Sequence, residues 1–392
     1  MTTKNPHDRP VVARVESFAL EHALPDGGYG TAKGLVSSRV CTLVKITTSD
    51  GVEGWGECYG VPELLTPYLS YYGRALLGVP VDAKENFVQQ VVAHSYHLST
   101  GGLHIAALSG LDIALWDAQA RGFGVSIGDL LGGVVRTTVP AYASIGYVTR
   151  DGDLDEFRGQ IQGAADEGFT AAKIKIGTGL RADRQRSEIT LDVLGPDGEL
   201  MVDYNANATA DVVLRSLRAL ADLEPGWAEE PLPPYQRDGW DRVREAGIPI
   251  AAGESLYTRF GFRDPIADGR MDIVQPDVTK CGGFTEAKLI TQMAYTWNRR
   301  VSPHCWGTGV AEAACLQLLS TLPDSPYGDG TGTPQYLEFD RGYNPLREAV
   351  LTKPIRLENG LVAVPAGPGL GITLAEGAIR KLAIAQLSVD IH

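Results

Sequence analysis

The sequence lacks several features that would place it in common protein classes. It has only five cysteines in 392 residues, an odd number with no C-x-x-C pair, so reduced thiols are expected rather than a disulfide framework. No basic run stands out and the net charge is -13, which argues against nucleic-acid binding. No apolar run reaches membrane-spanning length. We therefore expect a protein that binds neither nucleic acid nor a membrane.

Two further signals are missing. The first ten residues, MTTKNPHDRP, are polar and contain no apolar signal core, so we expect a cytoplasmic protein with a flexible tail over residues 1–10. The glycine fingerprint of dinucleotide-binding folds is absent after every predicted strand. What remains is ordinary globular composition, with 44% hydrophobic and 21% charged residues. A chain of this length predicts one large domain and a smaller one.

Short apolar runs recur through the middle of the chain, and most of them end in a polar side chain. From Lys175 onward these polar ends lie 23 to 34 residues apart, about the length of one strand–loop–helix–loop unit. This predicts a parallel α/β barrel over residues 136–350, with the polar side chains at one mouth. The predicted strands are roughly VPAYASIGY, AAKIKIG, LMVDYN, WAEEPL, IPIAAGE, DIVQPDV, RRVSPH and QYLEFD.

The segments on either side of the barrel predict a capping domain. Residues 1–135 contain alternating strand patterns followed by helical ones such as HIAALSGLDIALWDAQAR, which is typical of an α+β domain. Residues 351–392 have strand and loop character, and we expect them to return to this domain. The glycine- and proline-rich segment EHALPDGGYGTAKG predicts a long irregular loop that acts as a lid, with a disordered insert as the alternative.

Three acidic residues at the ends of consecutive predicted strands, Asp203, Glu229 and Glu254, are candidate metal ligands. Carboxylates gathered at one mouth repel one another unless a cation lies between them. Oxygen ligands without histidine or cysteine favour Mg²⁺, with Mn²⁺ as a substitute, over zinc. Strand alternation turns Glu230 away from Glu229, so we expect Glu230 in a supporting salt bridge. The alternative is that each acid is a helix cap or a surface ion pair.

Basic residues provide two candidate proton-transfer groups. Lys173 and Lys175 are two residues apart on one predicted strand, so both point into the barrel. Burying two like charges together is expected to lower the pKa of at least one lysine, which can then act as a general base. Asp277 beside His304 would orient the ring and raise its basicity, giving a second base across the mouth. Surface lysines and a chance acid–histidine pair are the alternatives.

Two bases that face each other across a divalent cation suit the removal and return of a proton next to a carboxylate. That proton is very weakly acidic, and the dianion left behind needs electrostatic stabilisation. Glu338, at the end of the eighth predicted strand, is placed to hydrogen-bond a substrate oxygen, with a surface acid as the alternative. The pattern therefore predicts an enzyme that acts on a small carboxylic acid.

These motifs, in this order, make the chain resemble the mandelate racemase subgroup of the enolase superfamily. The resemblance rests on ALSGLDIALWD and LLGG in the first domain and on K-I-K, D-Y-N, EEP, GES, QPDVTKCGG and PH in the barrel. It covers nearly the whole chain. It implies a (β/α)₇β barrel with an α+β cap completed by C-terminal residues, Mg²⁺ on the three acids named above, and a homo-oligomer.

The resemblance also implies roles for individual residues. Lys175 would act on one face of the substrate and His304, backed by Asp277, on the other, and which of them acts first stays open. The muconate-lactonizing and dipeptide-epimerase branches carry a lysine where this chain has Asp277, so the chain departs from them. The capping loop around residues 22–33 would set specificity. Implied substrate contacts are Lys173, Asn205, Trp306 and Glu338, with Lys280 just behind them.

Within the subgroup, PHCWGTGVAEAA and YLEFDRGYNPLREAVL look closest to galactarolactone and 3,6-anhydrogalactonate cycloisomerases. Those enzymes remove the proton α to a carboxylate of a sugar acid and expel a ring oxygen, so we expect an isomerase of this kind. An aldonate or aldarate dehydratase that forms a 2-keto-3-deoxy acid is the close alternative. A Schiff-base aldolase using Lys173 or Lys175, or a metal- and anion-binding module without catalysis, are alternatives of other classes. The sugar, its stereochemistry and the oligomeric state stay open.

Overall fold

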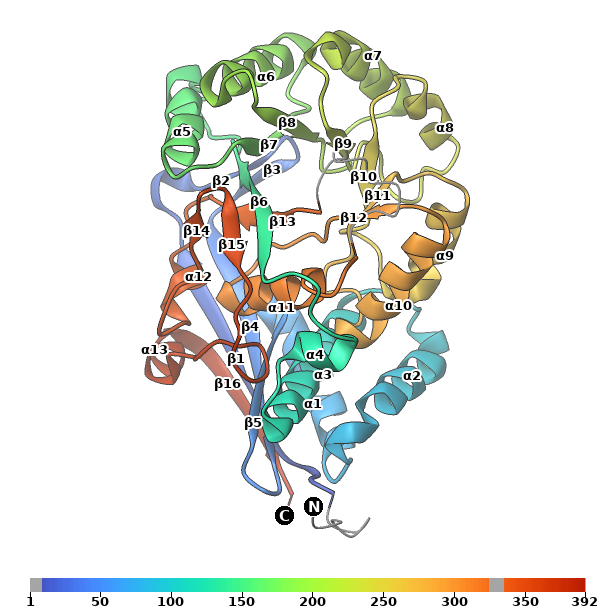
Figure 1. Cartoon of the computed structure of the whole chain (residues 1–392), viewed down its shortest axis with the longest axis vertical. Helices are drawn as coiled ribbons and strands as arrows, with labels where there is room; N and C mark the ends of the chain where they lie inside the picture. The colour runs from blue at the N-terminus through green and yellow to red at the C-terminus, as the bar shows by residue number, and fades with distance from the viewer. Residues whose placement is uncertain (1–8, 324–334, 392) are drawn as a thin grey trace.

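The computed structural model describes residues 9–323 and 335–391. Figure 1 shows two parts stacked along the long axis, with a ring of helices around a sheet above and a smaller sheet with helices below. The first and last described residues of the chain lie at the lower end, beside the strands of the smaller sheet. This arrangement brings the first and last segments of the chain together.

The lower part is the cap, an antiparallel sheet with helices packed against it. A Cβ at Gly56 would lie 2.1 Å from the Gly110 carbonyl oxygen, so glycine allows the strand that contains Gly56 and the helix that contains Gly110 to approach closely. The sheet has the order β16-β1-β4-β5, with β1 (Val12–Ala23), β4 (Ser38–Thr48), β5 (Glu53–Cys58) and β16 (Ala383–Asp390). Its helical segments are α1 (Pro62–Leu76), η3 (Val81–Ala83), α2 (Lys84–His94), η4 (Ser95–His97), α3 (Leu103–Phe123) and α4 (Ile127–Leu131).

The C-terminal residues contribute to both parts of the fold. β14 (Leu357–Glu358) and β15 (Leu361–Ala363) pair with each other, and β15 runs antiparallel to the first barrel strand. After α13 (Glu376–Leu382), β16 pairs antiparallel with β1, where Leu387 lies opposite Ser17. Completion of the cap by C-terminal residues is therefore confirmed for β16, whereas β14 and β15 lie on the barrel.

Two segments that we expected to be irregular are more ordered. Arg9 forms an ion pair with Asp82, and the Val81 amide donates to the Pro10 carbonyl at 3.0 Å. The predicted tail is therefore attached at residues 9–10, and its residues 1–8 lie outside the described residues. The predicted lid contains the 3₁₀ turn η2 (Pro25–Gly27) and a hairpin of β2 (Tyr29–Thr31) and β3 (Gly34–Val36).

Within the described residues, eight parallel strands form the upper part, each within or overlapping a predicted run. They are hydrogen-bonded in chain order from β6 to β12, and β13 pairs with β6 on its other side. This strand order is that of a (β/α)₇β barrel, so the predicted fold is confirmed. The strands are β6 (Thr138–Ile145), β7 (Ala171–Lys175), β8 (Glu199–Asp203), β9 (Trp227–Glu229), β10 (Ile250–Ala252), β11 (Ile273–Val274), β12 (Arg300–Val301) and β13 (Leu337–Asp340).

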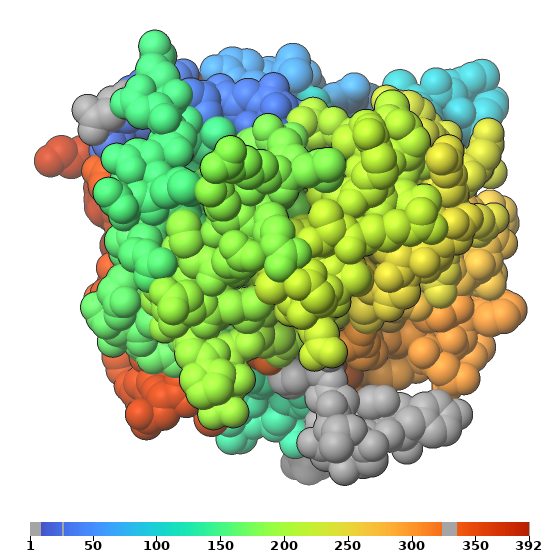
Figure 2. Space-filling model, turned by 90° about the horizontal axis from the view of Figure 1, so that it is seen from above, coloured from blue at the N-terminus to red at the C-terminus, as the bar shows by residue number. Residues whose placement is uncertain are grey.

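Helices alternate with these strands and cover the outside of the barrel. In α7 the buried residues Val213, Leu217 and Leu220 recur at helical spacing and face the sheet. Seen from above in Figure 2, the segments from α5 to α9, coloured green to yellow, form the visible wall. Within the described ranges, no helix combines the length and the apolar character needed to cross a bilayer. The helical segments are α5 (Leu154–Asp166), α6 (Leu180–Leu194), α7 (Ala210–Leu220), η5 (Ala221–Leu223), α8 (Gly239–Arg244), α9 (Thr258–Ala267), α10 (Gly283–Thr296), α11 (Gly309–Leu319) and α12 (Pro345–Ala349).

Side chains fill the interior of the barrel below its mouth. The Tyr142 and Trp227 rings meet edge to face with their centroids 5.4 Å apart. Because this layer closes the interior, polar groups further along the same strands are directed to the open end. The buried interior cluster consists of Tyr142, Ala171, Met201, Trp227, Ala251, Ile273 and Tyr336.

Candidate active site

The predicted site residues meet at the carboxyl ends of the barrel strands. Trp227 of the interior cluster is followed two residues later by Glu229, which strand alternation puts on the same inward face. Lys173 and Lys175 share the inward face of β7, where Lys175 is in register with Asp203 of β8. All of these charged side chains are buried. The structure therefore brings these predicted residues together at one end of the barrel.

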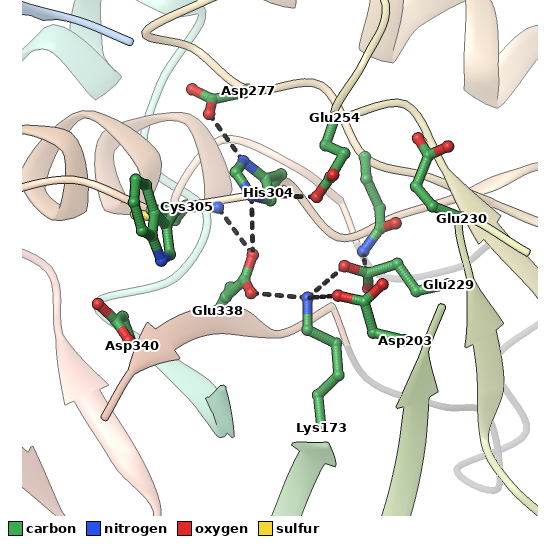
Figure 3. A network of polar contacts seen from close by, with 12 residues as sticks. Lys173, Asp203, Glu229, Glu230, Glu254, Asp277, His304, Cys305, Glu338 and Asp340 are labelled. Atoms are coloured by element: carbon green, nitrogen blue, oxygen red, sulfur yellow. Dashed lines mark hydrogen bonds and ion pairs between the residues drawn. The ribbon is translucent and has the colours of Figure 1, made fainter. Parts of the chain in front are cut away.

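Lys173 is the centre of a buried network of charges, shown in Figure 3. Its ammonium contacts Glu229 and lies 2.6 Å from Glu338 and 4.0 Å from Asp203. Burial opposes the charge on Lys173, but the carboxylates outweigh burial and raise its pKa well above the ordinary lysine value. Lys173 is therefore a permanent cation in this arrangement.

Lys175 is also paired, with its Nζ 2.5 Å from Asp203 Oδ2. Burial lowers the pKa of Lys175, but the Asp203 carboxylate more than offsets burial, so the pKa is raised. The expectation that crowding of the two lysines lowers the pKa of one is therefore wrong for this arrangement. The reason is that each ammonium pairs with a carboxylate, and for Lys175 the attraction of Asp203 outweighs the repulsion of Lys173.

His304 is held between two carboxylates. Its Nδ1 lies 2.7 Å from Asp277 Oδ2, and its Nε2 lies 3.2 Å from Glu254 Oε2. Burial opposes the imidazolium, but Glu338, Glu254 and Asp277 raise the pKa of His304 to about 9. The Asp277–His304 pair that the sequence predicts is present, and the ring carries a proton on both nitrogens at neutral pH.

Glu338 joins the two halves of the site. Its Oε1 lies 2.6 Å from the Lys173 ammonium, and its Oε2 accepts a hydrogen bond from the Cys305 amide at 3.0 Å. Burial alone would raise the pKa of Glu338, but Lys173, His304 and Lys175 lower it to about 2. Glu338 is therefore a buried anion, and the alternative of a surface acid is wrong.

The three predicted metal ligands lie at neighbouring strand ends, but each faces a different cation. Among residues 9–323 and 335–391, no group of three or more histidine, cysteine, aspartate or glutamate side chains is arranged to hold a metal ion. Attraction between opposite charges explains this arrangement, because each carboxylate pairs with a neighbouring cation. The pairs are Asp203 with Lys175, Glu229 with Lys173, and Glu254 with His304.

The donor set nevertheless fits a hard divalent cation. Burial raises the pKa of Glu229 to about 7, and Asp203, Glu338 and Glu254 add to the rise while Lys173 opposes it. Carboxylates that destabilise one another in this way are stabilised by a cation with two charges, and oxygen donors are the ligands that Mg²⁺ prefers. Asp203, Glu229 and Glu254 therefore stay our proposed ligands.

Glu230 turns away from Glu229, as strand alternation predicts. Its Oε1 accepts hydrogen bonds from the Gly253 amide at 3.0 Å and from Ser255 Oγ at 3.2 Å. Burial and the nearby Glu254 raise the pKa of Glu230 to about 8. In the part of the chain that the structure describes, amide and hydroxyl donors take the place of the predicted salt bridge, so that prediction is wrong.

Two of the four predicted substrate contacts, Asn205 and Trp306, line a cavity of about 380 Å³ at the mouth, whereas Lys173 and Glu338 are not among its lining residues. Asn205 lines the cavity, and its Oδ1 is buried without a hydrogen-bond partner among the described residues. Trp306 lines it too, with Nε1 donating to the Tyr147 hydroxyl at 3.0 Å. Lys280 lies one layer back, because its ammonium is 4.6 Å from the ring centroid of Tyr59, which itself lines the cavity.

Two residues beside the site were missed in the sequence. Gln275 Nε2 donates to Glu229 Oε2 at 2.6 Å; its place two residues before Asp277 on a predicted strand is a signal that would have found it. Arg39 on β4 forms a buried ion pair with Asp340, with its guanidinium carbon 3.7 Å from the Trp306 ring centroid. No local pattern indicates this contact between the cap and the barrel.

Matches to family models extend over both parts of the fold. Residues 156–378 match the family described as Enolase C-terminal domain-like, and residues 16–132 match the Mandelate racemase / muconate lactonizing enzyme, N-terminal domain. Over 374 residues the chain is 37% identical to a D-galactarolactone cycloisomerase of Agrobacterium fabrum, covering 94% of this chain and 98% of that protein. The chain belongs to the enolase superfamily, in its mandelate racemase subgroup, which is a family of enzymes.

Solved structures give the same result. The 3,6-anhydro-D-galactonate cycloisomerase from Zobellia galactanivorans superposes with a TM-score of 0.85 and 31% identity, covering 96% of this chain and 100% of that one. A racemase from Streptomyces coelicolor A3(2), solved with bound magnesium, superposes with a TM-score of 0.85 and 27% identity, covering 95% of this chain and 100% of that one. Comparison by sequence also finds a D-galactonate dehydratase from Variovorax paradoxus, which is 28% identical over 86% of this chain and 89% of that protein.

Proposed function

We propose that the protein is a Mg²⁺-dependent sugar-acid cycloisomerase. It removes the proton α to a carboxylate and expels a ring oxygen from the β-carbon of a galactarolactone- or 3,6-anhydrogalactonate-type substrate. The observation that carries the proposal is that Lys175 and His304 line the same cavity. They reach it from β7 and from the segment after β12, which are separated by at least two strands in both directions round the barrel. Two proton-transfer groups are thus set on different sides of one small ligand.

The buried charges next to the cavity suit a carboxylate substrate. Lys173 and Glu338 would hold the substrate carboxyl group from behind the cavity wall, because they pair with each other at 2.6 Å and Glu338 Oε2 lies 4.0 Å from Nε2 of His304, which lines the cavity. Asn205 offers an unsatisfied carbonyl oxygen to a sugar hydroxyl. When held by Asp203, Glu229 and Glu254, Mg²⁺ would supply positive charge to the substrate carboxylate and to the dianion formed on proton loss.

The proton removed from the substrate α-carbon would be taken up by Lys175 Nζ or by His304 Nε2. As the structure stands, Asp203 raises the pKa of Lys175, and Glu254 is among the acids that raise that of His304. Both acids are proposed metal ligands, so their engagement with a divalent cation removes charges that keep these nitrogens protonated. One nitrogen then acts as the base, and the other supplies a proton to the leaving oxygen or to the product carbon.

The proposal is tested with ¹H NMR in D₂O and Mg²⁺ on galactarolactone, 3,6-anhydrogalactonates and a panel of aldonates and aldarates. We expect the α-proton signal to disappear and a product with the mass of the substrate, apart from deuterium, to form. Solvent deuterium at no carbon of the product or of the recovered substrate would count against the proposal. Cytoplasmic location and homo-oligomeric assembly belong to the same proposal, and size-exclusion chromatography with light scattering tests the assembly.

An acid-sugar dehydratase is the second candidate, because relatives of that name align over most of the chain, including the D-galactonate dehydratase from Variovorax paradoxus. The first step is the same, but a hydroxyl leaves as water. A 2-keto-3-deoxy acid that is one water lighter than its substrate would select this candidate. A Schiff-base aldolase would use Lys173 or Lys175 as a neutral amine that attacks a substrate carbonyl, and none of the relatives named above carries an aldolase name. Borohydride trapping tests the aldolase, and tight binding of a sugar acid without turnover would indicate a non-catalytic module.

A further inference from the structure

The hairpin of β2 and β3 has a defined position over the barrel mouth. The Gly30 amide donates to the Val148 carbonyl at 2.9 Å, and the Val148 amide donates back to Gly30 at 2.9 Å. The Tyr29 ring packs against Tyr147, with centroids 4.7 Å apart. A Cβ at Gly30 would lie 2.0 Å from the Gly34 carbonyl oxygen, so glycine is required for the hairpin to close. Backbone pairing, rather than side-chain contact alone, holds this segment in place.

The hairpin places a lysine in the wall of the cavity. Lys33, an exposed residue between β2 and β3, lines the same cavity as Lys175 and His304. Its ammonium makes no ion pair or hydrogen bond with any other described residue, whereas Lys175 and His304 have the carboxylate partners described above. The hairpin side of the cavity therefore carries a cation whose charge is available to a ligand.

The position of this cation can be related to the reacting atoms. Glu254, a proposed metal ligand, lines the cavity together with Lys175 and His304. A substrate carboxylate on the Glu254 side and an α-carbon between Lys175 and His304 would direct the β-carbon and its leaving oxygen towards the remaining wall, which the hairpin forms. The nature of the leaving oxygen then matters. In a lactone it departs as part of a carboxylate, whereas in an anhydro sugar it departs as an alkoxide that needs a proton. An unpaired ammonium is matched to the carboxylate.

We propose that Lys33 contacts the end of the substrate remote from the metal site and selects a lactone of a dicarboxylic sugar acid, an inference that rests on the proposed function. The α-carbon–hydrogen bond breaks and its proton goes to the base. The bond from the β-carbon to the ring oxygen breaks, the oxygen keeps the electron pair, and a double bond forms between the two carbons. The resulting enol takes a proton at the β-carbon and loses its hydroxyl proton, giving a 2-keto dicarboxylate and one proton released to solvent.

The carboxylate that Lys33 would face is absent in the lactone and forms as the ring opens. Its contribution is therefore greatest in the transition state and in the product, and weakest in the bound substrate. Removing the ammonium is expected to lower kcat more than it raises KM. Abstraction of the α-proton takes place at the other end of the substrate and does not require Lys33. Loss of Lys33 should therefore slow the departure of the ring oxygen more than the abstraction of the α-proton. A general effect on the fold would slow both steps alike.

The test compares the Mg²⁺-loaded wild-type protein with Lys33→Met, which removes the charge, and Lys33→Arg, which keeps it. Lys353→Met, at an exposed lysine that does not line the cavity, is the matched control. With galactarolactone in D₂O, NMR reports both elimination and deuterium exchange into recovered substrate, and a pH indicator in water reports proton release. A second measurement is binding of galactarate, an open dicarboxylate, by calorimetry.

We expect Lys33→Met to reduce the kcat of elimination about tenfold, to raise the ratio of exchange to elimination, and to weaken galactarate binding by a similar factor. Lys33→Arg should stay within about threefold of the wild type, and Lys353→Met should match it. The inference is overturned if Lys33→Met eliminates at the wild-type rate, or if exchange and elimination fall in the same proportion.

Two wild-type results separate this inference from the proposed function. Turnover of a 3,6-anhydrogalactonate without turnover of the lactone would overturn the role of Lys33 and leave the cycloisomerase proposal standing. A wild-type protein that neither exchanges nor eliminates with any sugar acid would remove the proposed function and the role of Lys33 with it.

Discussion

His304 Nδ1 lies 2.7 Å from Asp277 Oδ2, while Nε2 of the same ring lies 3.2 Å from Glu254 Oε2. Asp277 in turn accepts hydrogen bonds from the Thr279 amide at 2.8 Å and its hydroxyl at 2.6 Å, so the carboxylate that orients the ring is itself fixed. Glu254 is a proposed metal ligand. The protonation of His304 is therefore coupled to the state of the acids at the strand ends.

Replacing Asp277 by asparagine should lower the pKa of His304 from about 9, because one of the carboxylates that raise it is lost. The ring nitrogens can be titrated by ¹⁵N NMR in the metal-free protein. In the Mg²⁺-loaded protein, elimination should slow by about 10²-fold or more. Asp268→Asn, at an exposed acid paired with Arg270, is the control. An unchanged His304 titration would show that Asp277 only packs against the ring.

The stability of the metal-free protein should fall as the pH rises from about 6.5 to 9. The folded-state pKa of His304 is raised from 6.5 to about 9, so its stabilisation is complete below pH 6.5 and is lost as the pH passes through 9. Glu230, raised to about 8, acts in the same direction at lower pH. The His304 contribution is on the order of 3 kcal/mol at most. Urea unfolding followed by circular dichroism should show that the free energy of unfolding falls less steeply with pH in His304→Gln than in the wild type. Equal slopes in the two proteins would contradict the assignment to His304.

The inward positions of the charged residues could be predicted because strand alternation is a local rule. Lys173 and Lys175 are two residues apart on β7 and share a face, whereas Gln275 and Asp277 follow the end of β11 and are both buried. Which charges pair could not be predicted from spacing. Lys173 contacts an acid 56 residues away, and the balance of its attractions and burial depends on distances across the barrel. The expected lysine pKa was wrong for this reason.

Contacts between the cap and the barrel were beyond sequence reasoning for a related reason. Arg39 and Asp340 are 301 residues apart. The pattern of each strand predicts which of its side chains are buried, but not which residue of a distant strand each one contacts. The β2–β3 hairpin was expected to be irregular, because its glycines suggest disorder in isolation. Its order comes from pairing between Gly30 and Val148, a contact that no local pattern contains.

Replacing Lys175 by alanine should reduce elimination by about 10²–10⁴-fold, because one of the two nitrogens that exchange a proton with the substrate is removed. NMR in D₂O then assigns the roles. If α-exchange is lost together with elimination, Lys175 is the base, and His304→Gln should retain exchange. Lys353→Met serves as the control at an exposed lysine. Wild-type rates of exchange and elimination in Lys175→Ala would exclude Lys175 from both steps.

Chelation of divalent cations should abolish turnover, and Mg²⁺ should restore it, because three buried or partly buried carboxylates at one mouth require a compensating charge. Calorimetry should show Mg²⁺ binding to the wild-type protein and at least about tenfold weaker binding to Glu229→Gln, which loses one charged donor. Glu358→Gln, at an exposed glutamate on β14, is the matched control. Equal Mg²⁺ affinity in Glu229→Gln and the wild type would remove Glu229 from the ligand set.

The ion pair between Arg39 on β4 and Asp340 on β13 joins the cap to the barrel. The side chains are 2% and 3% exposed, so Arg39→Met leaves a buried and uncompensated carboxylate and should lower the free energy of unfolding by about 3–5 kcal/mol. The double variant Arg39→Met/Asp340→Leu should recover much of this loss, because no charge is then left unpaired. Arg263→Ala, in the exposed pair with Asp264, should change stability by less than about 1 kcal/mol. Urea unfolding followed by circular dichroism measures all three, and a loss in Arg39→Met no larger than that in Arg263→Ala would show that this pair does not stabilise the joined fold.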